Sequence, residues 1–182
     1  MSEPSDWNAV QDCLSGKTEA FEMIVERHQK AIFNAALRMV EDYEDAQDIT
    51  QTVFVKAFDK LSSYNPKFKF FSWIYKMTMN ESINFLNQRK HHEELHPGLF
   101  SKEKTPEEKL EQAILSDKVQ DALMCLQPEY RATVVLRHFE EFSYREIAFI
   151  LEIPEKTVKS RLFSARQLLK DHLVAKGIPA NG

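Results

Sequence analysis

The sequence has few cysteines and glycines, and their scarcity restricts the kind of protein that it can encode. Cys13 and Cys125 are the only cysteines, too few for a disulfide framework or a thiolate metal site. Four Gly and seven Pro among 182 residues leave few of the residues that punctuate β-hairpins. Apolar and polar positions do not alternate as they do in strands, and no internal repeat occurs. A mostly helical protein is therefore predicted.

Long apolar runs and catalytic motifs are missing as well. No stretch approaches the ~20 consecutive apolar residues of a membrane-spanning helix. Residues 1–12 are acidic and polar, unlike a signal peptide. We therefore expect a cytoplasmic protein with reduced thiols and no membrane insertion of its own. Because no Ser/His/Asp set, Cys/His set, glycine-rich phosphate loop or HExxH motif occurs, we expect neither catalytic residues nor a cofactor, and so no enzyme.

Charge is distributed unevenly along the chain. The net charge is −4, but residues 62–90 hold five Lys and Arg against one Glu, and residues 156–176 hold six against one Asp. Two basic segments in an otherwise acidic chain are expected where separate surfaces contact phosphates. Taken alone, either segment is more simply interpreted as a solvated helix face.

Apolar residues recur at helical spacing on both sides of one polar segment. That segment, residues 91–112, contains Pro-Gly and Thr-Pro steps, and we interpret it as a linker. His91, His92 and His96 in and near it lack a carboxylate or thiolate framework, so no metal site is predicted. The expected fold is all-α, with two small helical domains joined by a flexible linker. The expected parts are domains at 1–90 and 113–175, the linker at 91–112 and a tail at 176–182.

Individual helices can be predicted from the same periodicity. In the first domain they cover about 21–39, 46–61 and 72–89, with a start near Asp42. In the second domain they cover 113–126, 129–139, 143–151 and a last helix that begins at Pro154. The second domain is thus a four-helix-type domain.

Residues 143–170 have the pattern of a helix-turn-helix. Ser143 and Glu146 have the spacing of a capping box, which opens a short helix. Pro154 ends that helix and starts a longer one, since Pro is tolerated in a first turn. The outward face of the longer helix offers side chains that reach base edges and phosphates. These are Lys156, Lys159, Ser160, Arg161 and Arg166. An ordinary helical hairpin with a basic face is the alternative.

Residues 64–80 interleave aromatic rings with lysines. This composition suits single-stranded nucleic acid, because bases stack on rings, at roughly 1–3 kcal/mol per base, while ammonium groups follow the phosphates. Most of the rings also fit a helical core, since Trp73, Ile74 and Met77 share one face. We therefore favour the 67–71 loop and Asn80 as ligand contacts, and treat Trp73 as mainly structural.

The chain resembles the extracytoplasmic-function sigma factors of the sigma-70 family, such as the RpoE-like proteins. Residues 126–170 resemble region four, most specifically in TVKSRL at 157–162 followed by Ala165 and Arg166. The first domain resembles region two in DAQD at 45–48, QTVF at 51–54, FSWI at 71–74 and Asn80. The resemblance covers about residues 16–172 apart from the linker. The family often has Gly at the positions of Glu152 and Lys156.

The resemblance implies an alternative sigma factor that directs promoter-specific transcription initiation under stress and under the control of an anti-sigma factor. Region four would place the last helix in the major groove of the upstream promoter element, which adds Thr157 to the residues above. Region two would bind the opened downstream element through Tyr64, Lys67, Phe68, Lys69, Phe70, Phe71 and Asn80. The core RNA polymerase, through its clamp helices and flap, would be the protein partner. The clamp-helix contacts would be Asp48, Gln51, Thr52 and Val55.

Two other functions remain open at this stage. A free-standing helix-turn-helix regulator would explain residues 143–170 but not the aromatic–lysine segment. A helical interaction protein without a DNA role would leave charge reversal at Lys159 and Arg161 without effect. The need for core polymerase in DNA binding distinguishes the first from a sigma factor.

Overall fold

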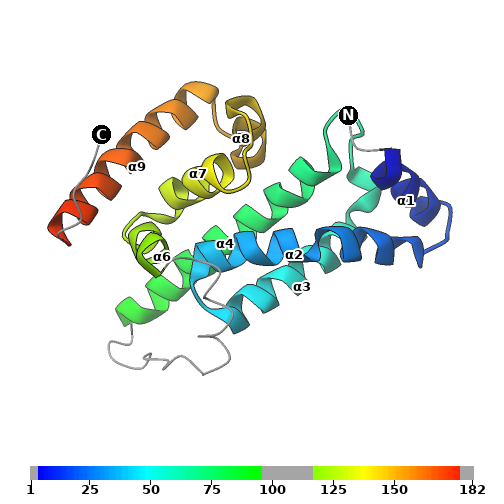
Figure 1. Cartoon of the computed structure of the whole chain (residues 1–182). Coiled ribbons are helices and arrows are strands. Elements are labelled where there is room, and N and C mark those ends of the chain that lie inside the picture. The colour runs from blue at the N-terminus through cyan, green and yellow to red at the C-terminus, as the bar shows by residue number, and fades with distance from the viewer. Residues whose placement is uncertain (1–3, 96–116, 177–182) are drawn as a thin grey trace.

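The computed structural model describes residues 4–95 and 117–176, and its regular elements in these ranges are all helices (Figure 1). The all-α prediction is confirmed. The predicted linker from residue 96 onwards, with His96, the start of the 113–126 helix and the tail from residue 177, lies outside the described residues. None of the described helices combines the length and apolar character needed to cross a membrane.

The first domain consists of α1 (Pro4–Leu14), α2 (Ala20–Val40), α3 (Tyr43–Asp59), a 3-10 turn η1 (Leu61–Ser63) and α4 (Phe70–Leu95). The predicted start of α3 is confirmed, because the Asp42 carboxylate accepts a hydrogen bond from the Asp45 N–H at 2.9 Å. Apolar side chains at helical spacing form the core of this domain: Ile24 and Ile32 on α2 and Val53 on α3 are completely enclosed.

Two features of the first domain were not predicted. The α1 helix was missed because its short sequence is acidic, yet Ala9 and Val10 are buried, and buried Asp6 bonds Arg27 and His28 of α2. The α4 helix was predicted to end near residue 89, but it continues to Leu95. No Gly or Pro stands in residues 90–95 to stop it, so the described helix enters the expected linker.

The second domain consists of α6 (Asp117–Met124), α7 (Pro128–His138), α8 (Tyr144–Leu151) and α9 (Glu155–Ala175). The predicted capping box of α8 is present in both directions: the Ser143 hydroxyl accepts from the Glu146 N–H, and the Glu146 carboxylate accepts from the Ser143 N–H. The fully buried side chains of α8 are Ile147 and Ile150, whereas Ala148 and Leu151 are partly exposed. The turn into α9 passes through Glu152 in the left-handed conformation, with φ 53°.

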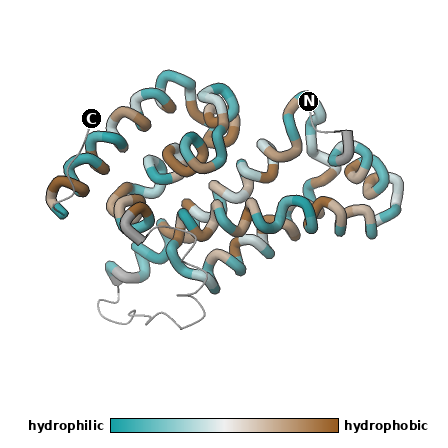
Figure 2. The backbone as a smooth tube through the Cα atoms, in the orientation of Figure 1, coloured by the Kyte–Doolittle hydropathy of each residue, from teal (hydrophilic) through white to brown (hydrophobic). Residues whose placement is uncertain are grey.

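The two domains pack against each other. The α4 helix lies beside α7 and α8, and α2 lies beside α6 and α7 (Figure 1). Hydrophobic and hydrophilic positions alternate along each helix, as in amphipathic helices that share one core (Figure 2).

Polar contacts add to this packing. Side chains of the second domain bind the carbonyl groups at the end of α2, Gln120 to Arg38 O at 3.3 Å and Arg131 to Met39 O. The Lys69 ammonium also donates to the Glu146 carboxylate, so the loop before α4 lies beside the first helix of the helix-turn-helix.

Candidate nucleic-acid and polymerase interfaces

The α9 helix presents one buried and one exposed face. Val158, Leu162 and Ala165 are at most 2% exposed and fix α9 in the domain. The predicted duplex contacts are on the other side: Lys156, Lys159, Ser160 and Arg166 are exposed, and Thr157 and Arg161 are half-buried. Because the buried stripe anchors the helix, the polar stripe is held outward on a rigid element.

One exposed residue on α9 was missed by the sequence analysis. Phe163 is 65% exposed and follows Lys159 and Ser160 by four and three residues, so it lies on the same side of the helix. A phenyl ring there can contact a thymine methyl group in the major groove. The signal that could have found it is a large apolar residue directly after Leu162, outside the helical spacing of Val158, Leu162 and Ala165.

The predicted strand-binding residues in and around the loop before α4 fall into two groups, buried and exposed. Tyr64 is 7% exposed and Phe70 is fully buried, so both belong to the core. The Tyr64 hydroxyl donates to Phe68 O at 2.7 Å, which holds the loop in shape. Lys67, Phe68 and Lys69 are exposed at its tip.

Phe70 is the first residue of α4, and the two remaining predicted residues lie further along this helix. Phe71 is half-buried in its first turn, and Asn80 is exposed further along the helix. Among the predicted residues, the exposed side chains are therefore those of Lys67, Phe68, Lys69 and Asn80. The structure places Tyr64 and Phe70 behind them.

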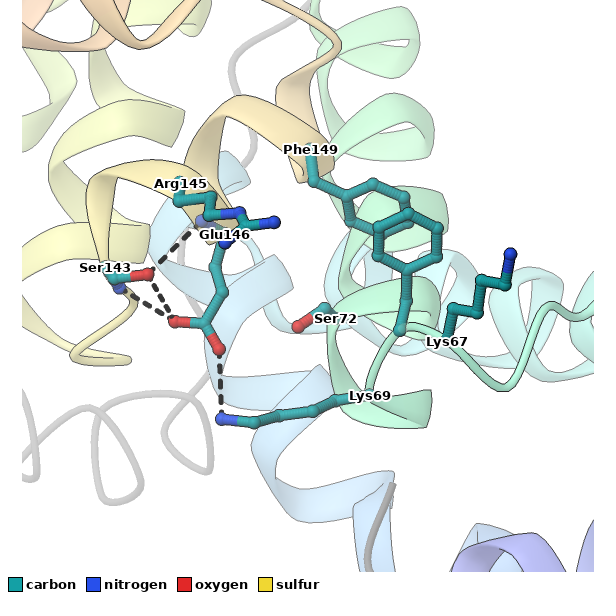
Figure 3. A pocket seen from close by; sticks show the side chains of 8 residues that line it. Lys67, Lys69, Ser72, Ser143, Arg145, Glu146 and Phe149 are labelled. Carbon is teal, nitrogen blue, oxygen red and sulfur yellow. Dashed lines mark hydrogen bonds and ion pairs between the residues drawn. The ribbon is translucent and has the colours of Figure 1, made fainter. Parts of the chain in front are cut away.

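A cleft of about 470 Å³ opens where this loop meets α8 (Figure 3). Lys67, Lys69 and Ser72 line it from the first domain, with Ser143, Arg145, Glu146 and Phe149 facing them from the second. The Phe68 and Phe149 rings stack across it, with centroids 4.1 Å apart and planes 14° apart. The Lys69 ammonium forms an ion pair with the Glu146 carboxylate at 3.0 Å.

Electrostatic conditions differ between the rim and the depth of the domain interface. Partial burial raises the pKa of Glu146, but hydrogen bonds from Ser143 and the contact with Lys69 outweigh it and hold that pKa below its usual value. Deeper inside, burial holds the pKa of Glu140 above its usual value, against the opposing effects of Tyr75 and Arg38. The Tyr75 hydroxyl donates to Glu140 at 2.5 Å, and burial followed by this carboxylate raises the tyrosine pKa strongly.

The α3 helix exposes the side chains that were predicted to face polymerase. Asp48, Gln51, Thr52 and Val55 are all exposed and are spaced as one stripe, with Val55 62% exposed. The opposite stripe, with Ala46, Ile49, Val53 and Ala57, is buried.

The comparisons with known proteins agree with this arrangement of two domains. The family Sigma-70 region 2 matches residues 24–92, and the family Sigma-70, region 4 matches residues 116–169. The ECF RNA polymerase sigma factor SigE of Mycolicibacterium smegmatis is 30% identical over 181 residues, which cover 94% of this chain and 70% of that protein. This chain belongs to the extracytoplasmic-function sigma factors.

Other relatives of this sigma factor cover both domains. The RNA polymerase sigma-H factor of Pseudomonas aeruginosa is 28% identical over 183 residues, 93% of this chain and 94% of that one. Among solved structures, CnrH in complex with the cytosolic domain of CnrY is 26% identical, with a TM-score of 0.72 over 94% of this chain and 98% of that one. The sigma factor RpoE of Bartonella quintana, in complex with the anti-sigma factor NepR, shares the fold at 23% identity, with a TM-score of 0.69 over 84% of this chain and 96% of that one. The family predicted from the motifs is confirmed.

Proposed function

We propose that this sigma factor directs core RNA polymerase to promoters by reading DNA at two places with separate surfaces. The observation that carries the proposal is the two-sided α9 helix, whose buried stripe fixes a row of exposed basic and hydroxyl side chains. Lys156, Lys159 and Arg161 supply charge for bases and phosphates of the upstream element, with Thr157, Ser160 and Arg166 beside them. Each good bidentate base contact contributes roughly 1–3 kcal/mol of discrimination.

The downstream element is bound as an opened strand at the loop before α4. Phe68 offers a ring for a base to stack on, and Lys67 and Lys69 supply charge for the neighbouring phosphates. Asn80 supplies an amide for the edge of an unpaired base. Tyr64 and Phe70 act from below, by holding the loop in shape.

The exposed stripe of α3, with Asp48, Gln51, Thr52 and Val55, binds the clamp helices of the largest polymerase subunit. This stripe combines one carboxylate, one amide, one hydroxyl and one apolar side chain. Such a mixture suits contact with a protein surface better than contact with a phosphate backbone. The flap of the polymerase would contact the second domain. The protein thus acts in the cytoplasm, together with polymerase.

Control by an anti-sigma factor is supported by the solved relatives. CnrH was solved with the cytosolic domain of CnrY bound, and its whole chain superposes on this one. We infer that a protein of that kind binds both domains of this sigma factor and releases it under stress.

Run-off transcription with purified core RNA polymerase on a library of promoter fragments tests the function. The wild-type chain should support initiation at specific sites. The double variant Lys159→Glu, Arg161→Glu should lose it, because two cations that face the phosphates become anions. The control is Lys30→Glu with Lys60→Glu, the same change of charge at exposed residues of the first domain. Tight duplex binding without polymerase, and no initiation with it, would contradict the proposal and favour a free-standing regulator.

A further inference from the structure

The α8 helix makes contacts with the strand-binding loop that resemble those of a nucleic-acid strand. Its Phe149 ring lies flat on the Phe68 ring, with centroids 4.1 Å apart and an angle of 14° between the planes. Most other ring pairs in the described core are tilted or edge-on, such as Tyr64 with Phe70 at 78°. Parallel stacking on an exposed ring is the contact that a base makes on an aromatic platform.

Carboxylates on either side of this ring pair with lysines, which is the contact that phosphates make with ammonium groups. Glu146, three residues before Phe149, pairs with Lys69 at 3.0 Å. Glu152, three residues after it, pairs with Lys76 at 2.7 Å. The spacing gives one stripe in the order acid, ring, acid, which faces the loop and the first turns of α4.

We propose that α8 acts as an internal mimic of single-stranded nucleic acid, which occupies the site for the opened strand until a promoter displaces it. The inference rests on the proposed role of the Lys67–Lys69 loop. In the packed state of the two domains, Phe68 is covered by a ring and Lys69 is neutralised by a carboxylate. The free sigma factor therefore binds single strands weakly.

The contacts on this stripe are suited to exchange with a ligand. The side chain of Lys69 is 56% exposed and that of Glu152 is 63% exposed, so their ion pairs are weak and screened by salt. Glu152 also holds a left-handed backbone conformation, with φ 53°, that favours Gly. A carboxylate at this strained position gives the turn nothing but places a charge opposite Lys76.

The mimic can leave the loop only together with its domain. Ile147 and Ile150 are fully buried, and α8 packs against α7 and α9 of its own domain. A bound strand must therefore move the second domain away from α4. Conversely, removing the Phe149 ring should shift the equilibrium of the domains toward the open state.

Two measurements on the full chain test the proposal. The first is the affinity for a short mixed-sequence single-stranded oligodeoxynucleotide at low salt. The second is energy transfer from Trp7 and Trp73, the only tryptophans and both in the first domain, to a dye on Cys125 of the second domain. Cys125 is exposed, and a Cys13→Ala background ensures single labelling. Oligonucleotide binding to this labelled chain should lower the energy transfer.

Phe149→Ala is the main variant, because it leaves the charge unchanged. Losing the aromatic pair should raise the oligonucleotide affinity roughly 2- to 12-fold and lower the energy transfer of the free chain. Leu168→Ala, which truncates a half-exposed apolar side chain on α9, should change neither. Glu152→Lys is a second variant, and Glu141→Lys is its match, since Glu141 is also left-handed at φ 57°. The oligonucleotide affinity should rise more for Glu152→Lys than for Glu141→Lys, although both substitutions add the same charge.

The proposal is overturned if Phe149→Ala binds the oligonucleotide no better than Leu168→Ala while both remain folded by circular dichroism. It is also overturned if a saturating oligonucleotide leaves the energy transfer of the wild-type chain unchanged. The strand and α8 would then occupy the loop at the same time and would not compete for it. Either result could occur in a chain that initiates transcription, so the proposed function would survive. A chain that fails in run-off transcription but passes both tests here would instead refute the function alone.

Discussion

Arg131 is the side chain whose loss should cost the most stability for its size. The residue is only 4% exposed. Its guanidinium donates hydrogen bonds to four carbonyl oxygens: Leu123 O at 3.0 Å, Met124 O at 3.2 Å, Leu126 O at 3.0 Å and Met39 O. The first three carbonyls lie at the end of α6 and just beyond it, and the fourth is in the last turn of α2. One side chain therefore satisfies helix-end carbonyls of both domains.

The cost of Arg131→Met follows from these carbonyls. Leu123 O keeps a second partner, the Leu126 N–H at 3.1 Å. The other three lose this donor, and at about 1–3 kcal/mol for each buried group the loss is roughly 3–9 kcal/mol. Burial also lowers the pKa of Arg131, so removing the charge regains part of its desolvation cost. We expect a net loss of about 3–5 kcal/mol in the free energy of unfolding.

Urea unfolding followed by two probes measures this loss. Tryptophan fluorescence reports the first domain and far-UV circular dichroism reports all helices, so the two transitions should separate if the second domain unfolds first. Arg131→Lys should lower the free energy of unfolding by more than half of the loss for Arg131→Met, because one ammonium group cannot span two helix ends. Arg137→Met is the matched control, since Arg137 donates to a single carbonyl, Phe142 O at 3.0 Å. A loss no larger than that of Arg137→Met would refute the reasoning.

Three further predictions concern the domain interface and the helix-turn-helix. Ser143→Ala removes the capping box and should lower the free energy of unfolding by about 0.5–2 kcal/mol in urea titrations, whereas Ser143→Asp should restore most of it. Glu152→Gly relieves a left-handed residue and should raise the thermal midpoint despite the loss of the exposed ion pair with Lys76; a fall would show that the ion pair outweighs the strain. The folded state holds the Glu140 proton more tightly than the unfolded chain, so its contribution to stability should fall as the pH rises from 4.5 through the raised pKa. Glu140→Gln should remove this part of the pH dependence, and identical pH profiles of the two chains would contradict it.

The helices of this protein could be predicted because each core stripe repeats at the helical period and most ends carry a local signal. Asp42 and the Ser143–Glu146 pair mark starts by side-chain geometry that depends only on neighbours in sequence. The α1 helix has weaker start signals, Pro4 at its first position and Asp6 in its first turn, and buried Asp6 contacts Arg27 and His28, more than 20 residues away. Periodicity does not report contacts of that kind.

The candidate surfaces were predictable only as sets of residues. A stripe of exposed side chains on α3 or α9 follows from the spacing of the buried ones, and the structure agrees with it. Within residues 64–71, however, aromatic composition alone does not separate a ring in the core, such as Tyr64, from a ring at the surface, such as Phe68. That division depends on how the loop folds back on η1 and α4, and so does the contact of Phe68 with Phe149.

The depth of the domain interface and its rim place opposite demands on the sequence. Tyr75 and Arg131 are buried, and the hydrogen bonds of Tyr75 to Glu140 and of Arg131 to Met39 O join the two domains. The stripe of Glu146, Phe149 and Glu152 is exposed at its edges and adds little to the stability of the interface. The stripe instead lowers the affinity for the single strand, because a site that is open in only a fraction of molecules binds with an affinity reduced by that fraction. An anti-sigma factor that binds the packed state lowers the fraction of molecules with an open site further. Weakening the contacts of the stripe should therefore lower the affinity for such an anti-sigma factor and raise the affinity for the strand.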